Sequence, residues 1–428
     1  MKKVVLTLFV ALMPALIWSQ ESVDIEAKYA EEIRNLAKSR EVERAFQAIY
    51  ALEPFTTEQH VELTEIAAPP FKEQQRAEAF AAKLRSVGLD SVWIDAVGNV
   101  LAYLPGTKGG KTVALNAHLD TVFPEGTDVT VVQRNDTLFA PGIGDDTRGL
   151  AMVLTIAKTM IEQQIRTDAH VLFVGTVGEE GLGDLRGVKE LFSERGPAID
   201  SWIAIDGGDI GRVNNKALGS YRYKVTYEGP GGHSWGAFGL ANPHHALGSA
   251  MHYFVKAADD YTKTGPRTSY NIGVIEGGTS VNSVPFSSSM LIDVRSIAPY
   301  RLDEMEELLN QAVQKALEDQ NSIRRRGEAL TVKLEKIGNR PSGELDPSLP
   351  LIQRAMAATQ HFGVTPELTR GSTDSNIPIS LGVPAITIGR GGRSGNAHSL
   401  DEWWVNDEGH KAIQLALLIL LSEAQLSR

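Results

Sequence analysis

Histidine and acidic residues recur in five short segments, each at a predicted strand end or in a glycine-rich turn. The side chains concerned are His118 with Asp120, Asp145 with Asp146, Glu179 with Glu180, Asp206, and His398. Histidine nitrogen and carboxylate oxygen form a ligand set that suits zinc without sulfur. Two dications about 4 Å apart repel each other, so one carboxylate is expected to bridge them. A water between them is acidified, and a carboxylate that is not a ligand can accept its proton.

Each segment alone has a simpler explanation. Asp145 and Asp146 can cap the helix that follows them, Glu179 and Glu180 can be a solvated pair, and His118 can be a structural hydrogen-bonding residue. Together the segments favour a metal site, because adjacent like charges at strand ends need a cation to balance them. In an extended chain Asp120 lies on the same side as His118, where it can fix the tautomer of the imidazole.

The composition of the chain argues against nucleic-acid binding and against cysteine-based chemistry. The chain has 42 Lys and Arg against 53 Asp and Glu, a net charge of −11, and we expect no nucleic-acid partner because such binding needs a basic face. Cysteine is absent, so disulfides and thiolate ligands are excluded.

The N-terminus has the pattern of a secretory signal peptide over residues 1–19. Lys2 and Lys3 precede an apolar stretch from Val4 to Trp18, and Ser19 begins a polar segment. We expect cleavage after Ser19, a periplasmic or secreted protein, and no stable membrane anchor once the segment is removed. An uncleaved anchor is less favoured because the apolar run is short for a bilayer.

The remaining pattern predicts an α/β protein of several units, since 428 residues exceed a typical single core. A helical N-terminal extension (20–56) precedes a catalytic domain whose first part is 57–217 and whose second part is 340–428. Residues 218–339 change to the order β-α-β-β-α-β of a ferredoxin-like unit. This unit is predicted to be inserted into the first, which requires only that its two ends lie close together.

These motifs resemble the family of di-zinc exopeptidases and deacylases that includes carboxypeptidase G, peptidase T, acetylornithine deacetylase and succinyl-diaminopimelate desuccinylase. The resemblance runs from about Val61 to the C-terminus, with all five segments in family order. It implies an α/β/α catalytic domain with a mixed sheet, an inserted lid and dimerisation domain, and two Zn²⁺ per subunit, with Co²⁺ or Mn²⁺ as substitutes. It assigns His118 and Asp206 to one zinc, Glu180 and His398 to the other, Asp145 to the bridge, Glu179 to the general base, and Asp120 to orienting His118.

Further positions resemble the substrate site of that family. His233, after two glycines, is implied to donate to the oxyanion in the active site of a partner subunit, so we expect a homodimer through the inserted domain. Without the resemblance His233 is an ordinary loop histidine. Asn282 and Arg295 are implied to bind substrate, although a surface ion pair is an alternative for Arg295. The loop Gly371, Ser372 and Thr373 is implied to line the pocket.

Two positions depart from the family pattern. Thr147 and Arg148 stand where many relatives have lysine, and Trp235 follows Ser234 where a small pair is common. The leading expectation is an exported di-zinc exopeptidase that acts on short peptides through a metal-bridging water activated by Glu179. A deacylase of N-acyl amino acids is the nearest alternative. A non-catalytic binding protein is more distant, because a pure binder has no need of Glu179.

Overall fold

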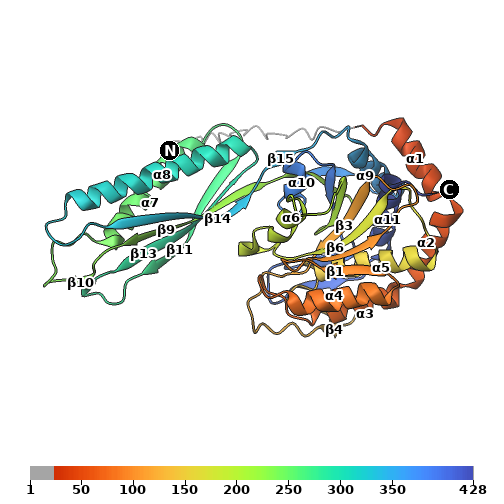
Figure 1. The fold of residues 1–428 in the computed structure, drawn as a ribbon, viewed down its shortest axis with the longest axis horizontal. Coiled ribbons are helices and arrows are strands. Elements are labelled where there is room, and N and C mark those ends of the chain that lie inside the picture. The colour runs from red at the N-terminus through yellow and green to blue at the C-terminus, as the bar shows by residue number, and fades with distance from the viewer. Residues whose placement is uncertain (1–23, 428) are drawn as a thin grey trace, which may run out of the picture.

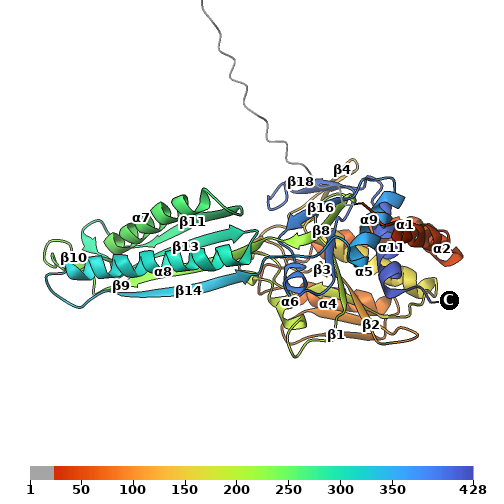
Figure 2. The same ribbon diagram turned by 90° about the horizontal axis from the view of Figure 1, so that it is seen from above.

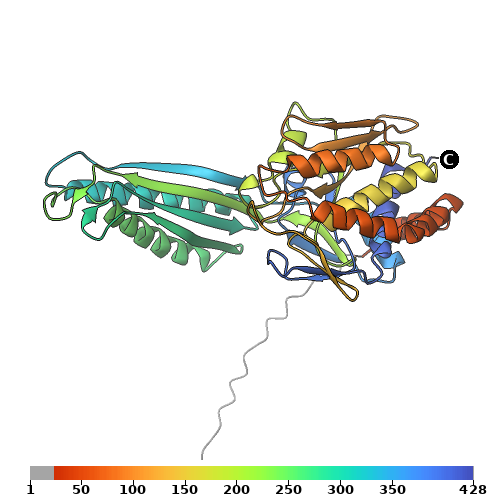
Figure 3. The same ribbon diagram turned by 90° about the horizontal axis from the view of Figure 1, so that it is seen from below.

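The computed structural model describes residues 24–427, so the predicted signal segment, residues 1–19, lies outside the described residues. The described chain forms two lobes joined at one end of an elongated molecule (Figure 1). One lobe contains both the N-terminal helices and the C-terminal helix. The other lobe is built from a single middle stretch of the sequence, and the views from above and below show it extending away from the first (Figures 2 and 3).

A mixed nine-stranded sheet forms the centre of the larger lobe. Its strands follow the order β1 (Ser91–Ile94), β2 (Val100–Leu104), β6 (His170–Thr176), β3 (Thr112–His118), β7 (Ser201–Ile205), β17 (Ala385–Ile388), β8 (Arg212–Ala217) and β15 (Gly343–Glu344), with β16 (Glu367–Gly371) paired to β8. The central strands β6, β3, β7 and β17 are parallel, while β1 and β2 are antiparallel to their neighbours. All residues of β3 and β7 are buried, as expected for apolar strands covered on both faces. The predicted mixed α/β class is confirmed.

Helices from distant parts of the chain cover this sheet. They are α3 (Glu53–Thr64), α4 (Gln74–Ser86), α5 (Thr147–Glu162), α9 (Pro350–His361) and α11 (His410–Ala424), with the shorter η1 (Gly181–Gly183), α6 (Arg186–Leu191) and α10 (Asn376–Ser380). Helices α5 and α11 are almost wholly buried because apolar residues surround them. Among residues 24–427 there is no helix with the length and hydropathy needed to cross a bilayer.

The N-terminal extension forms two helices, α1 (Ala27–Ala37) and α2 (Arg40–Ala51), where the sequence pattern predicts one continuous helix. The break falls at Ser39, whose hydroxyl accepts from the amide of Val42 and caps α2. Helix α1 packs on α9 and α2 on α11. Arg354 of α9 links α1 and α11, because it contacts Glu32 of α1 at 2.9 Å and Glu423 of α11 at 2.8 Å. The extension is thus part of the larger lobe.

The smaller lobe consists of one antiparallel sheet covered by two helices. Its elements are β9 (Gly219–Glu228), β10 (Gly232–His233), α7 (Pro243–Thr262), β11 (Thr268–Gly277), β12 (Ser283–Val284), β13 (Ser287–Ser296), α8 (Pro299–Ser322) and β14 (Thr331–Arg340). The sheet order is β11-β13-β9-β14, and β10 pairs only with β12. Helices α7 and α8 contact each other and both pack on β9 and β13 over a separate apolar core. Both ends of this stretch, at β9 and β14, are neighbours in the sheet, as an inserted unit requires.

A small second sheet of the larger lobe was not predicted. It has the order β18 (Arg393–Gly395), β19 (Trp403–Val405), β5 (Thr137–Phe139) and β4 (Val132–Arg134). Trp404 of this sheet is buried with Leu138 and Ile143. His60 of α3 packs edge-on against Trp404 and donates from Nε2 to the carbonyl oxygen of Ile143 at 2.5 Å. These contacts hold the turn that leads to Asp145.

The burial of His60 predicts a pH-dependent stability. Burial, together with the nearby Arg148, lowers the pKa of His60 to about 3 from its ordinary value of 6.5. The unfolded state therefore binds a proton between these two values while the folded state does not, so stability falls as the pH drops below 6.5. From pH 7 to pH 5 we expect the unfolding free energy of the wild type to fall about 2 kcal/mol more than that of His60→Gln.

Urea unfolding at both pH values, followed by tryptophan fluorescence, measures this difference. His245→Gln, at an exposed position of α7, is the control and should keep the pH dependence of the wild type. Equal pH dependence of the wild type and His60→Gln would contradict the assignment.

Candidate active site

The predicted metal ligands lie at one edge of the central sheet. His118 ends β3, Glu179 and Glu180 follow β6, and Asp206 follows β7. Because these three strands are parallel, their carboxyl ends bring the side chains to the same edge. Asp145 directly precedes the cap of α5, and His398 lies in the loop between β18 and β19.

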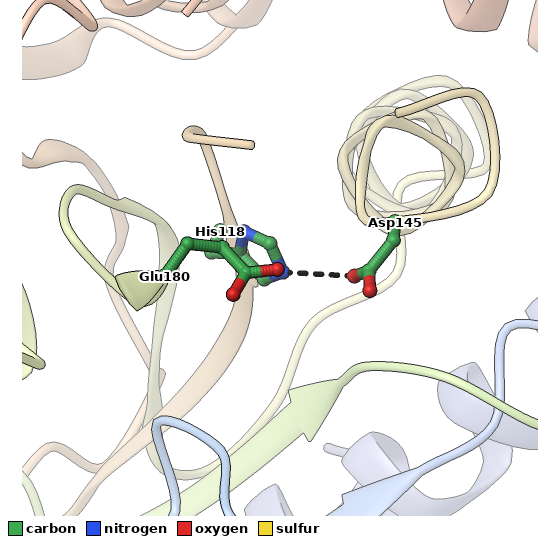
Figure 4. A group of neighbouring side chains, drawn as sticks. All are labelled: His118, Asp145 and Glu180. Atoms are coloured by element: carbon green, nitrogen blue, oxygen red, sulfur yellow. Dashed lines mark hydrogen bonds and ion pairs between the residues drawn. The ribbon is translucent and has the colours of Figure 1, made fainter. Parts of the chain in front are cut away.

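Asp145 lies between the two histidines. Its Oδ1 is 3.1 Å from His118 Nε2, and its Oδ2 is 3.3 Å from His398 Nε2. His398 Nε2 is also 2.9 Å from Glu180 Oε1. One ligand atom each from His118, Asp145 and Glu180 lies within 4.8 Å of the others, and Figure 4 shows these three side chains facing one another. A carboxylate with one oxygen toward each histidine fits the predicted bridge, and the nitrogen and oxygen donors fit a pair of divalent cations.

Arg390 completes this cluster and was not predicted. Its Nη1 lies 3.1 Å from Asp145 Oδ1, 3.4 Å from Asp146 Oδ1 and 3.9 Å from Asp206 Oδ1. The Arg390 side chain is 4% exposed and its Nε has no hydrogen-bond partner among the described residues. Burial opposes ionisation of Asp145, but Arg390 and the two histidines outweigh it and hold the pKa of Asp145 well below its usual value. Burial and the charge of Asp145 raise the pKa of Asp206.

Asp120 fixes the segment that carries the two glutamates. Its carboxylate accepts from the amides of Glu179 at 2.9 Å and Glu180 at 2.8 Å. The hydrogen-bond contact of Asp120 with His118 is made by its backbone carbonyl, 3.0 Å from Nδ1, while Asp120 Oδ1 is 3.7 Å away. Asp120 is therefore placed to orient His118 through the backbone and, in addition, to position both glutamates through its side chain.

Glu179 is buried beside Glu180 and faces the pocket. Arg340, the last residue of β14, donates from Nη1 to Glu179 Oε1 at 3.0 Å and contacts the backbone carbonyl of Glu179 through Nη2. Burial and the charge of Glu180 raise the pKa of Glu179 well above its usual value, although Arg340 opposes this shift. A carboxyl with a raised pKa is suited to accepting and returning a proton near neutral pH.

Glu402 shapes the turn before Asp145. Its carboxylate accepts from the amides of Gly142 and Gly144 at 2.8 Å each and from the amide of Asp145 at 2.9 Å. A methyl group built at Gly144 would lie 2.8 Å from Glu402 Oε1, so a larger residue there would have to displace this carboxylate. The glycine-rich turn is thus held by a residue only four positions after His398.

A pocket of ≈ 650 Å³ opens over the cluster. Of the residues predicted for the site, those that line it are Asp145, Glu179, Glu180, Asp206, Arg295, Ser372, Thr373 and His398. His118 and Asp120 are buried beneath it, and Gly371 lies in β16 just before the lining loop. His233 and Asn282 do not reach it within one chain, because β10 and β12 lie toward the far end of the smaller lobe (Figure 1).

Two histidines and several carboxylates around an open pocket, at the edge of a mixed α/β sheet, define a metal-dependent hydrolase. The description of the peptidase family M20/M25/M40 matches residues 114–422. The chain therefore belongs to this family, as the sequence motifs predict.

Individual relatives agree with this membership. Carboxypeptidase G2 from Pseudomonas sp. (strain RS-16) is 25% identical over 320 residues, which cover 71% of this chain and 73% of that protein. A tripeptidase from Staphylococcus aureus has a TM-score of 0.68 and 22% identity, covering 86% of this chain and 97% of its own. The YXEP protein of Bacillus subtilis, a dinuclear metal-binding M20 peptidase, has a TM-score of 0.61 and 15% identity over 88% of this chain and 99% of its own. These structures share the fold.

The position of Arg390 predicts that its replacement changes the stability of the protein differently with and without bound metal. Because its guanidinium balances Asp145, Asp146 and Asp206, replacing it with methionine leaves buried like charges unbalanced in the metal-free protein. The same change removes a cation that repels an incoming metal ion. We expect Arg390→Met to lower the unfolding temperature in the presence of a chelator by several degrees, and to increase the further rise produced by zinc.

Differential scanning calorimetry with chelator and with zinc tests this expectation. Arg393→Met, which removes an exposed partner of Asp407, is the matched control and should leave both temperatures unchanged. A zinc-induced rise that is the same in Arg390→Met and the wild type would refute the balancing role.

Proposed function

We propose that this protein is a di-zinc exopeptidase that hydrolyses an amide bond in short peptides. The observation that carries the proposal is the placement of Glu179. It lies next to Glu180 in sequence and faces the pocket, but it is held by Arg340 rather than by the histidines that contact Glu180 and Asp145. Glu179 is thus available for proton transfer beside the ligand cluster.

In the proposed reaction each residue of the cluster has a separate role. His118 and Asp206 would hold one zinc, Glu180 and His398 would hold the other, and Asp145 would contribute to both. When bound, the cations polarise the substrate carbonyl and acidify water. Glu179 takes a proton from the attacking water and passes it to the departing amine, so the peptide bond breaks without free acid or base. Asp120 keeps Glu179 in position by accepting a hydrogen bond from the backbone amide of Glu179.

Removal of the Glu179 carboxylate tests this assignment. We expect Glu179→Gln to lower kcat about 10²- to 10⁴-fold while the protein still binds two metal ions per chain. Turnover of dipeptides, tripeptides and N-acetyl amino acids, beside metal analysis by mass spectrometry, gives both quantities. Glu276→Gln, at an exposed position of β11, is the control.

Full turnover in Glu179→Gln would exclude the proton-transfer role. Hydrolysis of N-acetyl amino acids alone would reassign the protein to the deacylases, and zinc binding without any hydrolysis would favour a binding protein. Export from the cytoplasm stays a prediction of the sequence.

We further propose that the protein acts as a homodimer in which His233 serves the pocket of its partner. His233 is exposed, and its Nδ1 accepts from the amides of Trp235 and Gly236 at 3.2 Å each. The proton of a neutral ring therefore lies on Nε2, which is free to donate to a developing oxyanion.

Mixed dimers test this arrangement. His233→Ala and Glu179→Ala should each be inactive, and equal mixing should restore about one quarter of the wild-type activity, since half of the dimers regain one of two sites. Subunit exchange is verified by two different affinity tags. No recovery in exchanged dimers would refute action across the interface.

A further inference from the structure

Five arginines line the pocket, and four of them already have a carboxylate partner. Arg222 and Arg295 contact Asp293 at 3.1 and 2.8 Å. Arg340 contacts Glu179, and Arg390 contacts Asp145.

The fifth, Arg212, makes no ion pair and no side-chain hydrogen bond with any residue between 24 and 427. We propose that Arg212 binds a carboxylate group of the substrate. This inference rests on the proposed function and names the substrate class.

Glycines on two sides make room for the Arg212 side chain. Arg212 begins β8 and is half-buried. A methyl group built at Gly371 would lie 2.7 Å from Arg212 Nη2, and one at Gly207 would lie 3.4 Å from Nη1. At Gly208 it would lie 3.3 Å from Cδ. The guanidinium thus passes between the turn that follows Asp206 and the loop that carries Ser372 and Thr373.

This position fits an anion-binding role. Arginine presents planar donors that match a carboxylate in a bidentate arrangement. A half-buried guanidinium that lacks a protein acceptor gains most from a ligand that supplies one. Arg295, which the family resemblance assigns to substrate binding, is already paired with Asp293, whereas Arg212 is free in the described chain.

Two substrate groups carry this chemistry, namely the C-terminal carboxylate of a peptide and an acidic side chain. Both lie within reach of a short peptide in a pocket of this size. A set of four tripeptides separates them: Ala-Ala-Ala and Ala-Ala-Glu, each as the free acid and as the C-terminal amide. The first and last of these carry one carboxylate each, from different sources.

The kinetic test compares wild type, Arg212→Met and Arg212→Lys on the four peptides. We expect Arg212→Met to raise KM for the carboxylate-bearing peptide about 10- to 100-fold relative to Ala-Ala-Ala amide, with kcat nearly preserved. Arg212→Lys should recover part of this loss, because lysine keeps the positive charge but lacks the paired donors of the guanidinium. Loss confined to free-acid peptides identifies the C-terminus, and loss confined to glutamate peptides identifies the side chain.

Binding provides a measurement that does not require turnover. In the Glu179→Gln background, calorimetry with the zinc-loaded protein should show that Arg212→Met weakens binding of the peptides that carry the recognised carboxylate, by about the same factor, relative to Ala-Ala-Ala amide. Equal weakening of all four peptides, or no weakening, would overturn the role of Arg212. Failure of the wild type to hydrolyse any peptide would instead overturn the proposed function, while the binding difference would still be measurable.

Discussion

The balance of charge around Asp145 is the constraint on which the site depends. Asp145, Asp146 and Asp206 approach one another at the edge of the sheet, with Glu179 and Glu180 nearby, and most of these carboxylates are buried. Ionised carboxylates at such separations repel strongly unless cations lie between them. Arg390 supplies one fixed positive charge, and the ligand geometry of His118, Asp145 and Glu180 provides for metal ions. The repulsion between these carboxylates therefore opposes folding and at the same time favours the binding of metal ions.

The surrounding elements hold these charges in place by directed hydrogen bonds to backbone amides. Asp120 binds the Glu179–Glu180 segment, and Glu402 binds the turn before Asp145. His60 contacts the same turn through the carbonyl oxygen of Ile143 and packs against Trp404. Because the segments that carry Asp145 and Glu180 are tied to partners far away in sequence, the positions of these predicted ligands are set by the fold as a whole rather than by local chain preference.

The main elements follow from the sequence because hydrophobic periodicity reports them directly. Buried strands such as Val171–Val174 and the amphipathic α8 are visible as patterns, and the order β-α-β-β-α-β of the second lobe follows from their succession. Ser39 was missed as a break because the residues on both sides favour helix and the cap depends on one side chain. The small sheet was missed because β4, β5, β18 and β19 have only three residues each.

The predicted ligands His118, Glu180 and Asp206 were recognisable because their types and their positions after apolar strands coincide. Arg390 has the same signal, since it follows β17 in the run Gly389-Arg390-Gly391-Gly392, but a search restricted to metal-ligand types passes over arginine. Nothing in the sequence marks Arg212, because its lack of a carboxylate partner among residues 24–427 depends on the three-dimensional structure. The trans role of His233 stays a prediction, because it depends on a second chain.

The contacts of β14 and β9 with the loop after β6 have a mechanical consequence. Arg340 grips the carboxylate and carbonyl of Glu179, and Arg222 of β9 contacts the carbonyl of Gly181. Both arginines belong to the strands through which the smaller lobe is attached, so a rotation of that lobe about its attachment would act on the segment from Glu179 to Gly181. Because this lobe is long, a small force at its far end would be transmitted through the two arginines to the backbone of Glu179.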